Sequence, residues 1–373
     1  MIEKIIGKFN IKGELVCVVT NNSGNINNTY VATFLNEDGT SRKYLIQKIN
    51  TTVFTEPYKL MKNIEGVTSY LKREMAKKKD KEHQVLEVIK TRDNKSLCCV
   101  ECNGEKDYYR IYEFIENTVT YDCSVDAGIV YNTGKAFGNF QKLLRGYPIA
   151  KLSETIKDFH DTEKRYQKLT QDIKIDSKGR VMEVAPEIVF ILMREDIYPA
   201  IMERLGSEKI PYRVTHNDTK VNNVMMNKDT GEYMAVIDLD TVMPGSLLFD
   251  YGDGVRSTAS TAREDETDLS KVSLDLELFK AYTKGYLSEM APYITEEELG
   301  LMGESIRIIT LELAIRFLND YINGDTYFKT NYEKHNLDRV RNQLALVKDI
   351  ESKMDYINGF INDSYQEYKL ERE

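Results

Sequence analysis

The amino-acid sequence predicts an α+β fold, in which an N-terminal antiparallel sheet with one helix is followed by a larger, mainly helical C-terminal lobe. Up to residue 115, short apolar runs alternate with polar residues and are separated by turn-forming Asn, Asp and Gly, a pattern typical of strands. From Asp126 onward the apolar residues recur with the helical period. A chain of 373 residues, 41% of them hydrophobic, can bury a core in each region, so we expect two domains, 1–115 and 116–373.

The N-terminal strands are expected where β-branched and aromatic residues gather, and Pro57 begins a helix whose apolar residues recur at helical spacing. The expected strands are 15–20, 30–34, 44–49, 85–91, 97–101 and 108–115, and the expected helix is 57–75. Together they form an antiparallel sheet of about five strands with one helix. Cys99 and Cys102 fit alternation along a strand better than a zinc site, because no second pair of ligands has the required spacing.

The C-terminal region contains several amphipathic stretches that predict helices. The first begins near Asp126, and glycines at 128, 134 and 138 permit it to pack closely against a neighbour. The other expected helices are 163–173, 185–205, 274–287, 296–323 and 337–357.

Candidate chemistry centres on a predicted β-hairpin whose strands are 224–226 and 233–237. Asp218 and Asn223 precede the first strand in the spacing H-x-D-x-x-x-x-N. Asp238 follows the second strand, so the hairpin brings it back beside the other two residues. Two carboxylates and one amide are therefore expected to meet at one end of the hairpin.

This cluster suits phosphoryl transfer. Mg²⁺ takes oxygen ligands and keeps several waters, so one carboxylate, one amide oxygen and the substrate phosphates are enough to hold it. The spacing matches the arrangement in which kinases place a catalytic base, a metal-binding asparagine and a metal-binding aspartate. By this mapping Asp218 is the base, and Lys220 neutralises the transferring phosphate. Asn223 and Asp238 hold the metal. The alternative interpretation is an ordinary hairpin with solvated acids.

The chain resembles the aminoglycoside-phosphotransferase-type small-molecule kinases, and within them it is most similar to the N-acetylhexosamine 1-kinases. Besides the motif above, the resemblance is carried by NNSGNINNTY at 21–30, YLIQKIN at 44–50, VMPGS at 242–246 and RFLNDY at 316–321. It covers most of the chain and implies a protein-kinase-like two-lobed fold, ATP with Mg²⁺ as cofactors, and a small-molecule sugar as acceptor. Phosphorylation of the anomeric hydroxyl of an N-acetylhexosamine is implied by the resemblance alone.

The nucleotide is expected in the N-terminal lobe. In kinases the third strand carries a cation for the phosphates, for which Lys48 has the right chemistry, and Glu65 on the following helix would pair with it. A different register would place Gln47 there and leave Lys48 as an exposed lysine at a strand end. The expected nucleotide-binding residues are Gly24 and Asn25 in the phosphate loop, Lys48, Glu65, and Glu113 and Ile115 at the crossing between lobes.

The C-terminal lobe is expected to bind the acceptor. Arg316 lies within an apolar helical face, so it needs a partner, which is either an internal acid or the oxygens of a sugar or phosphate. In related kinases an aspartate braces the catalytic loop through backbone N–H groups; Asp250 fits that role, and Asp253 is expected to face the substrate. His160 is a helix-start or packing residue, and only the family likeness suggests a substrate role.

Composition limits the partners. The net charge of −9 argues against nucleic acid and anionic membranes. No apolar run reaches about 18 residues, and the N-terminus lacks a signal peptide's apolar region, so a cytoplasmic protein without membrane partners is expected.

Three functions are consistent with these features. The first is the hexosamine 1-kinase, the second is a kinase of the same fold acting on an aminoglycoside, choline or homoserine, and the third is a non-catalytic binding protein. Arg316 argues against a polycationic aminoglycoside as the acceptor. The joint presence of Asp218, Asn223 and Asp238 argues against a protein that only binds.

Overall fold

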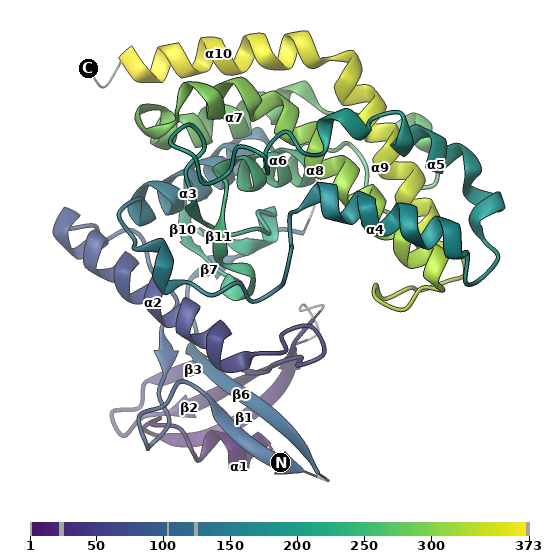
Figure 1. Ribbon diagram of the computed structural model, residues 1–373. Coiled ribbons are helices and arrows are strands. Elements are labelled where there is room, and N and C mark those ends of the chain that lie inside the picture. Colours follow the sequence, from purple (N-terminus) through teal and green to yellow (C-terminus); the bar gives the residue numbers. More distant parts are fainter. Residues whose placement is uncertain (1, 22–25, 103, 123–125, 371–373) are drawn as a thin grey trace.

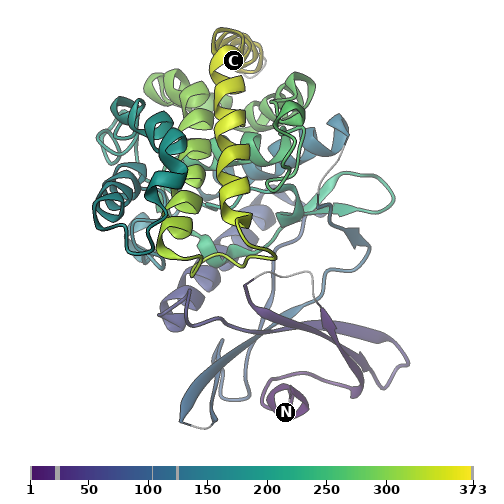
Figure 2. The same cartoon turned by 90° about the vertical axis from the view of Figure 1, so that its right-hand side faces the viewer.

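The computed structural model has two lobes, with the N-terminal sheet at one end and the helical region at the other (Figure 1). It describes residues 2–21, 26–102, 104–122 and 126–370. The long helix α2 (Pro57–Lys78) lies between the sheet and the helical lobe, as the turned view also shows (Figure 2). The predicted α+β, protein-kinase-like fold class is confirmed.

The N-terminal lobe is built on one antiparallel sheet. Within the described residues it has six strands in the order β1-β2-β3-β6-β4, with β5 also paired to β6. The elements of this lobe besides α2 are α1 (Ile2–Ile6), β1 (Glu14–Asn21), β2 (Asn28–Leu35), β3 (Ser41–Lys48), β4 (Val88–Ile89), β5 (Cys98–Cys102) and β6 (Glu105–Glu113). Along β5, Cys98 is buried and Cys99 is exposed, which fits the expected strand alternation.

The C-terminal lobe is mainly helical and holds short strands where the catalytic motif lies. Its elements are β7 (Thr118–Val119), α3 (Ala127–Leu144), α4 (Thr162–Ile175), α5 (Ala185–Leu192), β8 (Arg213–Thr215), β9 (Val224–Asn227), β10 (Tyr233–Val236), β11 (Met243–Gly245), α6 (Leu247–Thr258), α7 (Leu276–Met290), α8 (Glu296–Asn323), α9 (His335–Ser352) and α10 (Met354–Leu370). β7 is the first strand after residue 115, and it pairs with β9 of the C-terminal lobe. We therefore keep the proposed domain boundary between residues 115 and 116.

Two helices of this lobe approach each other at glycines. A Cβ atom added at Gly134 of α3 would clash with the Tyr282 carbonyl oxygen of α7, and one at Gly285 of α7 would clash with the Tyr131 carbonyl oxygen. These contacts require residues without a side chain, as the glycine pattern of the first helix predicted. The backbones of α3 and α7 therefore pack closely together, and α3 also contacts β8 and β10.

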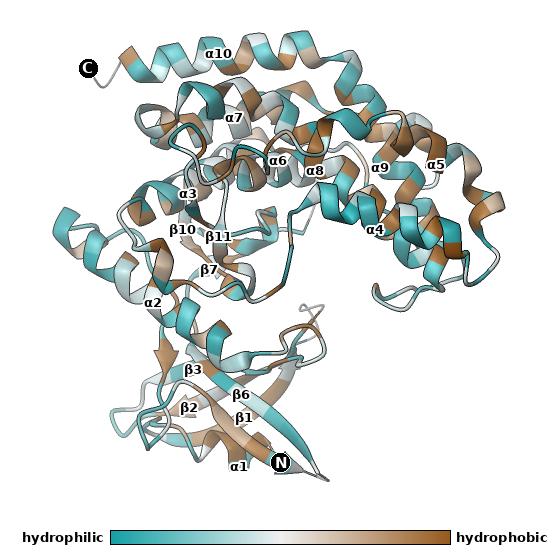
Figure 3. Cartoon of the chain, in the orientation of Figure 1, coloured by the Kyte–Doolittle hydropathy of each residue, from teal (hydrophilic) through white to brown (hydrophobic). Residues whose placement is uncertain are grey.

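Helix α8 crosses the middle of the helical lobe. It packs against α4, α6, α9 and α10, and hydrophobic residues recur along α8 and the helices around it (Figure 3). A helix of this kind is stable when neighbours surround it. Glu312 of α8 is thereby buried in the interior of the lobe, and Arg316, one turn later, is partly buried.

The structure corrects three of the expected elements. Residues 185–205 are not one helix, because α5 ends at Leu192 and short turns follow. The expected span 337–357 is divided at Lys353 between α9 and α10. Helix α6 was missed because two glycines lower its helix propensity; its first turn is capped by the Ser246 side chain, which accepts the Leu248 N–H. In the described ranges, no helix combines the length and the apolar character needed to cross a membrane.

Candidate active site

The predicted hairpin is present, and it brings Asn223 and Asp238 to the same end. β9 and β10 pair through Val224 and Val236, and the Ile237 N–H donates to the Asn223 carbonyl oxygen at 2.9 Å. Asp238 then leaves the strand with a φ of 57°, a left-handed value that is uncommon for residues other than glycine. Surrounding structure must hold such a backbone in place, and strain of this kind is concentrated at functional sites.

Asp218 lies in the loop before β9, between a cation and an amide. Lys220 Nζ is 2.8 Å from Asp218 Oδ1. Asn223 Nδ2 donates to Asp218 Oδ2 at 3.1 Å and to the Asp218 carbonyl oxygen at 2.8 Å. Because its amide nitrogen is directed at Asp218, the Asn223 amide oxygen is the atom that can meet a metal. The negative charge of Asp218 raises the pKa of Lys220, which keeps the lysine protonated.

Asp250 braces this catalytic loop from the helical side, as the sequence predicted. Its side chain is fully buried and accepts backbone N–H groups from His216 at 2.9 Å and from Asn217 at 2.7 Å. The Asn217 side chain in turn donates to the Thr241 carbonyl oxygen at 2.8 Å. The loop is thereby fixed both to α6 and to the segment that follows Asp238.

The buried imidazole of His216 connects the segments of Asp218 and Asp238. His216 Nδ1 accepts the Asp218 N–H at 3.3 Å, so the ring proton is on Nε2. Nε2 then donates to the Ile237 carbonyl oxygen at 2.8 Å. The position of Asp218 therefore depends on the same imidazole that holds the end of β10.

Asp238 is an acid with a strongly perturbed pKa. Asp238 is exposed to solvent on one side, but protein surrounds its carboxylate on the others. The resulting loss of bulk water, together with the negative charges of Asp240 and Asp218, raises the pKa of Asp238 to about 7. Arg110 and Lys220 act in the opposite direction. A carboxylate in such surroundings is stabilised by a bound cation.

The donor atoms at the hairpin end fit Mg²⁺. They are the Asp238 carboxylate and the Asn223 amide oxygen, both of them the hard oxygen ligands that this ion prefers. Across the described parts of the chain, no group of three His, Cys, Asp or Glu side chains is arranged as an all-protein metal cage. A metal held by these two residues would therefore take its remaining ligands from phosphates and water.

The structure corrects the expectation for Lys48. This lysine lies on the face of β3 against which α1 packs, and it forms an ion pair with Asp107 at 2.7 Å. Gln47 points to the other face, toward α2 and the helical lobe, because side chains alternate along a strand. Glu65 forms an ion pair with Lys90. The expected pair between Lys48 and Glu65 is therefore wrong.

The other expected nucleotide contacts stay predictions. Gly24 and Asn25 lie outside the described residues. Glu113 ends β6 and donates its backbone N–H to the Glu87 carbonyl oxygen at 2.9 Å. The Ile115 carbonyl oxygen accepts the hydroxyl of Thr118 at 2.9 Å. Both residues lie in the crossing between the lobes, where backbone atoms were expected to meet adenine.

Asp253 supports the catalytic loop. Its Oδ2 accepts the Thr219 N–H at 3.0 Å, and its Oδ1 accepts from Arg256 Nε at 3.0 Å and from Nη2 at 2.8 Å. Burial alone would raise the pKa of Asp253, but the charges of Arg256, Lys220 and His160 and the hydrogen bond from Arg256 together lower it. Protein groups thus engage both oxygens, and the expected contact of Asp253 with the substrate stays a prediction.

Arg316 projects from α8 between two aromatic rings, those of Phe159 at 5.2 Å and Phe328 at 5.5 Å from the guanidinium carbon. The acid one turn earlier, Glu312, is engaged by His160 and by the Thr162 hydroxyl instead. Over the described residues, Arg316 therefore lacks the internal salt bridge that was one of its two expected roles. The interpretation as a substrate contact remains.

His160 is a site residue whose role the sequence left open. It is buried, with Nδ1 2.9 Å from Glu312 Oε1 and Nε2 3.3 Å from the Asn217 carbonyl oxygen. Both partners are acceptors, so both ring nitrogens carry a proton when these bonds form. Burial alone would lower the pKa of His160, but the charge and hydrogen bond of Glu312, together with the charge of Asp253, raise it above its ordinary value. The imidazolium connects α8 to the catalytic loop.

The raised pKa of His160 predicts a pH-dependent contribution to stability. The folded-state pKa lies above the ordinary value of 6.5, so the contribution is complete below pH 6.5 and is lost as the pH rises through the folded value. We expect His160→Gln to lower the thermal unfolding midpoint most at acidic pH, with a smaller difference from wild type at alkaline pH. Thermal melts of both proteins across pH measure this difference. A difference that does not vary with pH would contradict the charged pair with Glu312.

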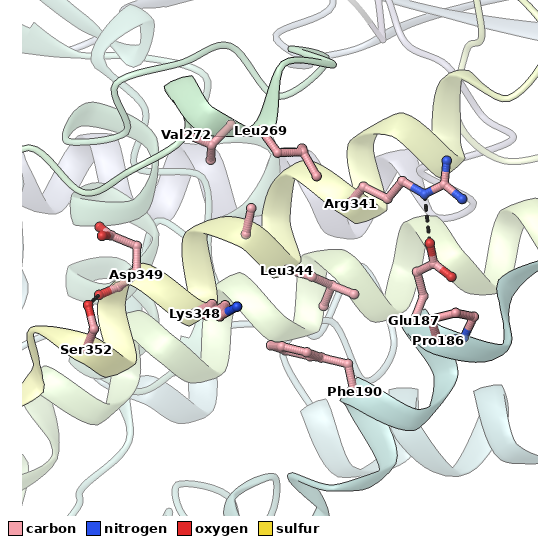
Figure 4. Close-up of a pocket in the computed structure, with 11 residues that line it drawn as sticks. Pro186, Glu187, Phe190, Leu269, Val272, Arg341, Leu344, Lys348, Asp349 and Ser352 are labelled. Atoms are coloured by element: carbon pink, nitrogen blue, oxygen red, sulfur yellow. Dashed lines mark hydrogen bonds and ion pairs between the residues drawn. The ribbon is translucent and has the colours of Figure 1, made fainter.

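A cavity of about 660 Å³ lies elsewhere, between α5 and α9 (Figure 4). Phe190, Leu269 and Leu344 contribute apolar lining, and Glu187 accepts a hydrogen bond from Arg341 at 2.7 Å at one end. The catalytic loop, the hairpin and Arg316 contribute no residue to it. This cavity is therefore separate from the candidate active site.

The fold and the site together are those of a two-lobed phosphotransferase, with Asp218 held in a loop and oxygen donors at the end of a hairpin. The chain belongs to the phosphotransferase enzyme family of the APH type, whose family model matches residues 21–293. It is therefore a phosphotransferase enzyme.

Solved structures share this fold at low sequence identity. A microcompartment-associated aminopropanol kinase is 14% identical with a TM-score of 0.63, and the match covers 96% of this chain and 98% of that one. An amicoumacin kinase in complex with AMP-PNP and Ca²⁺ is 14% identical with a TM-score of 0.56, covering 95% and 96%. A spectinomycin phosphotransferase in complex with ADP and spectinomycin is 13% identical with a TM-score of 0.52, covering 95% and 97%.

Proposed function

We propose that this protein is an ATP-dependent, Mg²⁺-requiring kinase that phosphorylates the anomeric hydroxyl of an N-acetylhexosamine. The observation that carries the phosphoryl-transfer chemistry is the position of Asp218 between Lys220 and Asn223, beside Asp238. Complexes of related folds with AMP-PNP and with ADP support ATP as the donor. The sugar is supported by the sequence likeness and by the surroundings of Arg316. The cytoplasm stays the proposed location on sequence features alone.

Asp218 is placed to accept the proton of the attacking hydroxyl. Lys220 and Asn223 hold its two carboxylate oxygens in one orientation. A positioned base of this kind contributes about 10²–10⁴-fold to the rate. Lys220 adds positive charge beside the path of the transferring group. Mg²⁺, when bound, neutralises phosphate charge, and Asn223 and Asp238 are the residues that would hold it.

The acceptor subsite is proposed around Arg316. The rings of Phe159 and Phe328 flank its guanidinium and limit its movement. A sugar presents hydroxyl and carbonyl oxygens in fixed directions, which the forked donors of an arginine can bind. Asp253 is the second residue proposed to contact the sugar, from the side of the catalytic loop that it already supports through Thr219.

The second candidate is a kinase of the same fold with an amine acceptor, the class to which the aminopropanol kinase belongs by name. An ammonium group requires an acidic subsite. Near α8, however, two arginines lie close together. The pKa of Arg165 is lowered, first by burial and second by the positive charge of Arg316. The charge of Glu312 is already compensated by His160. These charges favour a neutral acceptor over a cationic one.

Arg316→Ala is expected to raise the KM for the sugar or lower kcat, with little change in the KM for ATP, because the lost donors face only the acceptor. Steady-state kinetics with each substrate varied in turn measures this. Arg145→Ala is a matched control, since Arg145 also lies over an aromatic ring, that of Tyr293, but belongs to another part of the lobe. Equal losses toward sugar and ATP, or unfolding, would instead make Arg316 a structural residue.

A screen of acceptors with ATP tests the proposed substrate class. We expect N-acetylglucosamine or N-acetylgalactosamine to stimulate ADP release, and choline, ethanolamine and kanamycin to leave it at the background rate. Stimulation by an amine and by no sugar would contradict the sugar assignment. It would leave the kinase chemistry of Asp218 in place.

A further inference from the structure

Arg110 is the buried cation that contacts the segment after the hairpin. It lies on β6, directly opposite Gln47 of β3, and only 1% of its surface is exposed. Its Nη1 is 2.5 Å from Asp240 Oδ1, its Nη2 donates to Asp240 Oδ2 at 2.8 Å, and its Nε donates to Gln47 Oε1 at 2.9 Å. This bidentate pair joins the N-terminal sheet to the C-terminal lobe.

Asp240 receives a second bond from the N-terminal lobe. The Asn27 side chain donates to Asp240 Oδ2 at 2.7 Å, and Asn27 Oδ1 accepts the Asn50 N–H at 3.0 Å. Asn27 immediately precedes β2, at the end of the loop expected to cover the phosphates. Asp240 follows Asp238 by two residues. The start of β2 and the metal-type carboxylate are therefore connected through one buried acid.

We propose that Arg110 is the positioning residue that sets the Asp238 segment for Mg²⁺·ATP, in the place that kinases usually give to a lysine of the third strand. This inference rests on the ATP and Mg²⁺ use proposed above. On β3, the position that faces α2 and the helical lobe is occupied by Gln47, a neutral residue. Lys48 forms an ion pair with Asp107 on the opposite face. Cross-strand neighbours share a face, so β6 supplies the cation that β3 lacks.

A buried pair of this kind holds its geometry only while both partners are present. Removing one partner leaves an unpaired charge in the interior, whereas removing both is often tolerated. Arg110 makes two contacts to Asp240 and one to Gln47, so its loss leaves Asp240 bound to the N-terminal lobe only through Asn27 and loosens Asp238, which is two residues away in the chain. The reaction itself needs no contact between Arg110 and substrate.

The test is calorimetric titration of Mg²⁺·ATP and, separately, of adenosine, with no acceptor present. Arg110→Met is expected to weaken Mg²⁺·ATP binding by about 10- to 100-fold, the usual effect of losing a residue that orients a metal ligand. Adenosine binding should change by less than about twofold, because the crossing between the lobes is untouched. Arg110→Lys should recover part of the loss. Lys48→Met, which breaks an ion pair on the opposite face of the same sheet, is the matched control and should bind Mg²⁺·ATP as wild type does.

If Arg110→Met does not fold, the double variant Arg110→Met/Asp240→Leu removes both charges, and we expect it to fold without recovering Mg²⁺·ATP affinity. Wild-type affinity in either of these variants, or the loss appearing in Lys48→Met instead, would overturn the inference. So would an equal loss of adenosine and Mg²⁺·ATP binding. A wild-type protein that binds no nucleotide would contradict the proposed ATP use itself, which keeps the two failures distinct.

Discussion

Asp218→Asn is expected to lower kcat by about 10²–10⁴-fold or more while ATP still binds, because the substitution removes the proton acceptor. Asparagine keeps the shape of the side chain, and its single oxygen can still accept the hydrogen bond from Asn223, whereas the ion pair with Lys220 is lost. Single-turnover kinetics measures the chemical step, and calorimetry measures ATP affinity. The two quantities should separate clearly in this variant.

Asp229→Asn is the matched control for this variant. Asp229 lies in the turn of the same hairpin, is exposed, and accepts a hydrogen bond from Asn117 at 2.8 Å. Its substitution also removes one negative charge but should leave kcat near the wild-type value. Substantial turnover by Asp218→Asn with the native acceptor would remove Asp218 from the role of base.

Asp238→Asn is expected to remove most Mg²⁺·ATP binding and activity, yet to raise the thermal stability of the metal-free protein. The pKa of Asp238, about 7, lies above the ordinary carboxyl value of 3.8. Its ionisation therefore costs stability progressively as the pH rises from 3.8 to about 7. Asparagine removes that charge, so the unfolding midpoint without Mg²⁺ should be higher than wild type at pH 8. The gain should disappear below pH 3.8.

The Mg²⁺ dependence of the same variant tests the metal assignment. Asn223→Ala should weaken Mg²⁺·ATP binding less than Asp238→Asn does, because it removes a neutral ligand and the other variant removes the charged one. An unchanged Mg²⁺ requirement in Asp238→Asn would contradict the proposed ligand. A metal-free protein that is less stable than wild type at pH 8 would contradict the account of its pKa.

The parts of the site that are local in sequence could be predicted. Asn223 and Asp238 flank the two strands of one hairpin, and Asp218 lies in the loop five residues before Asn223, so the turn and two short strands bring most of this cluster together. The role of Asp250 could also be anticipated, because it lies close behind the same segment.

The parts that depend on pairing between distant strands could not be predicted. A shift of one residue in the pairing of β3 with β6 would exchange Gln47 and Lys48 between the two faces of the sheet. Apolar residues precede them on both faces of β3, so the hydrophobic pattern does not distinguish the two registers. The partner of Asp240 is Arg110, which lies far away in sequence on a strand that has no motif. No local pattern indicates that contact.

The helical lobe shows the same division. The apolar face around Arg316 predicted a helix with the bounds observed for α8, but not which side chains would meet it. Phe159 and His160 are neighbours in one segment and Phe328 lies in another, and only tertiary packing brings both segments to α8. The predicted helix 185–205 failed because the hydrophobic pattern continues past Leu192 while the backbone turns.

The identity of the phosphorylated position tests the central proposal most directly. Purified protein, ATP, Mg²⁺ and an N-acetylhexosamine are incubated, and the product is examined by proton-coupled phosphorus NMR. We predict one new phosphate monoester whose phosphorus couples to the anomeric proton, with stoichiometric ADP, and no such product with Asp218→Asn. A phosphate on any other hydroxyl, or ADP formation that no N-acetylhexosamine stimulates, would contradict the proposal that this chain is a hexosamine 1-kinase.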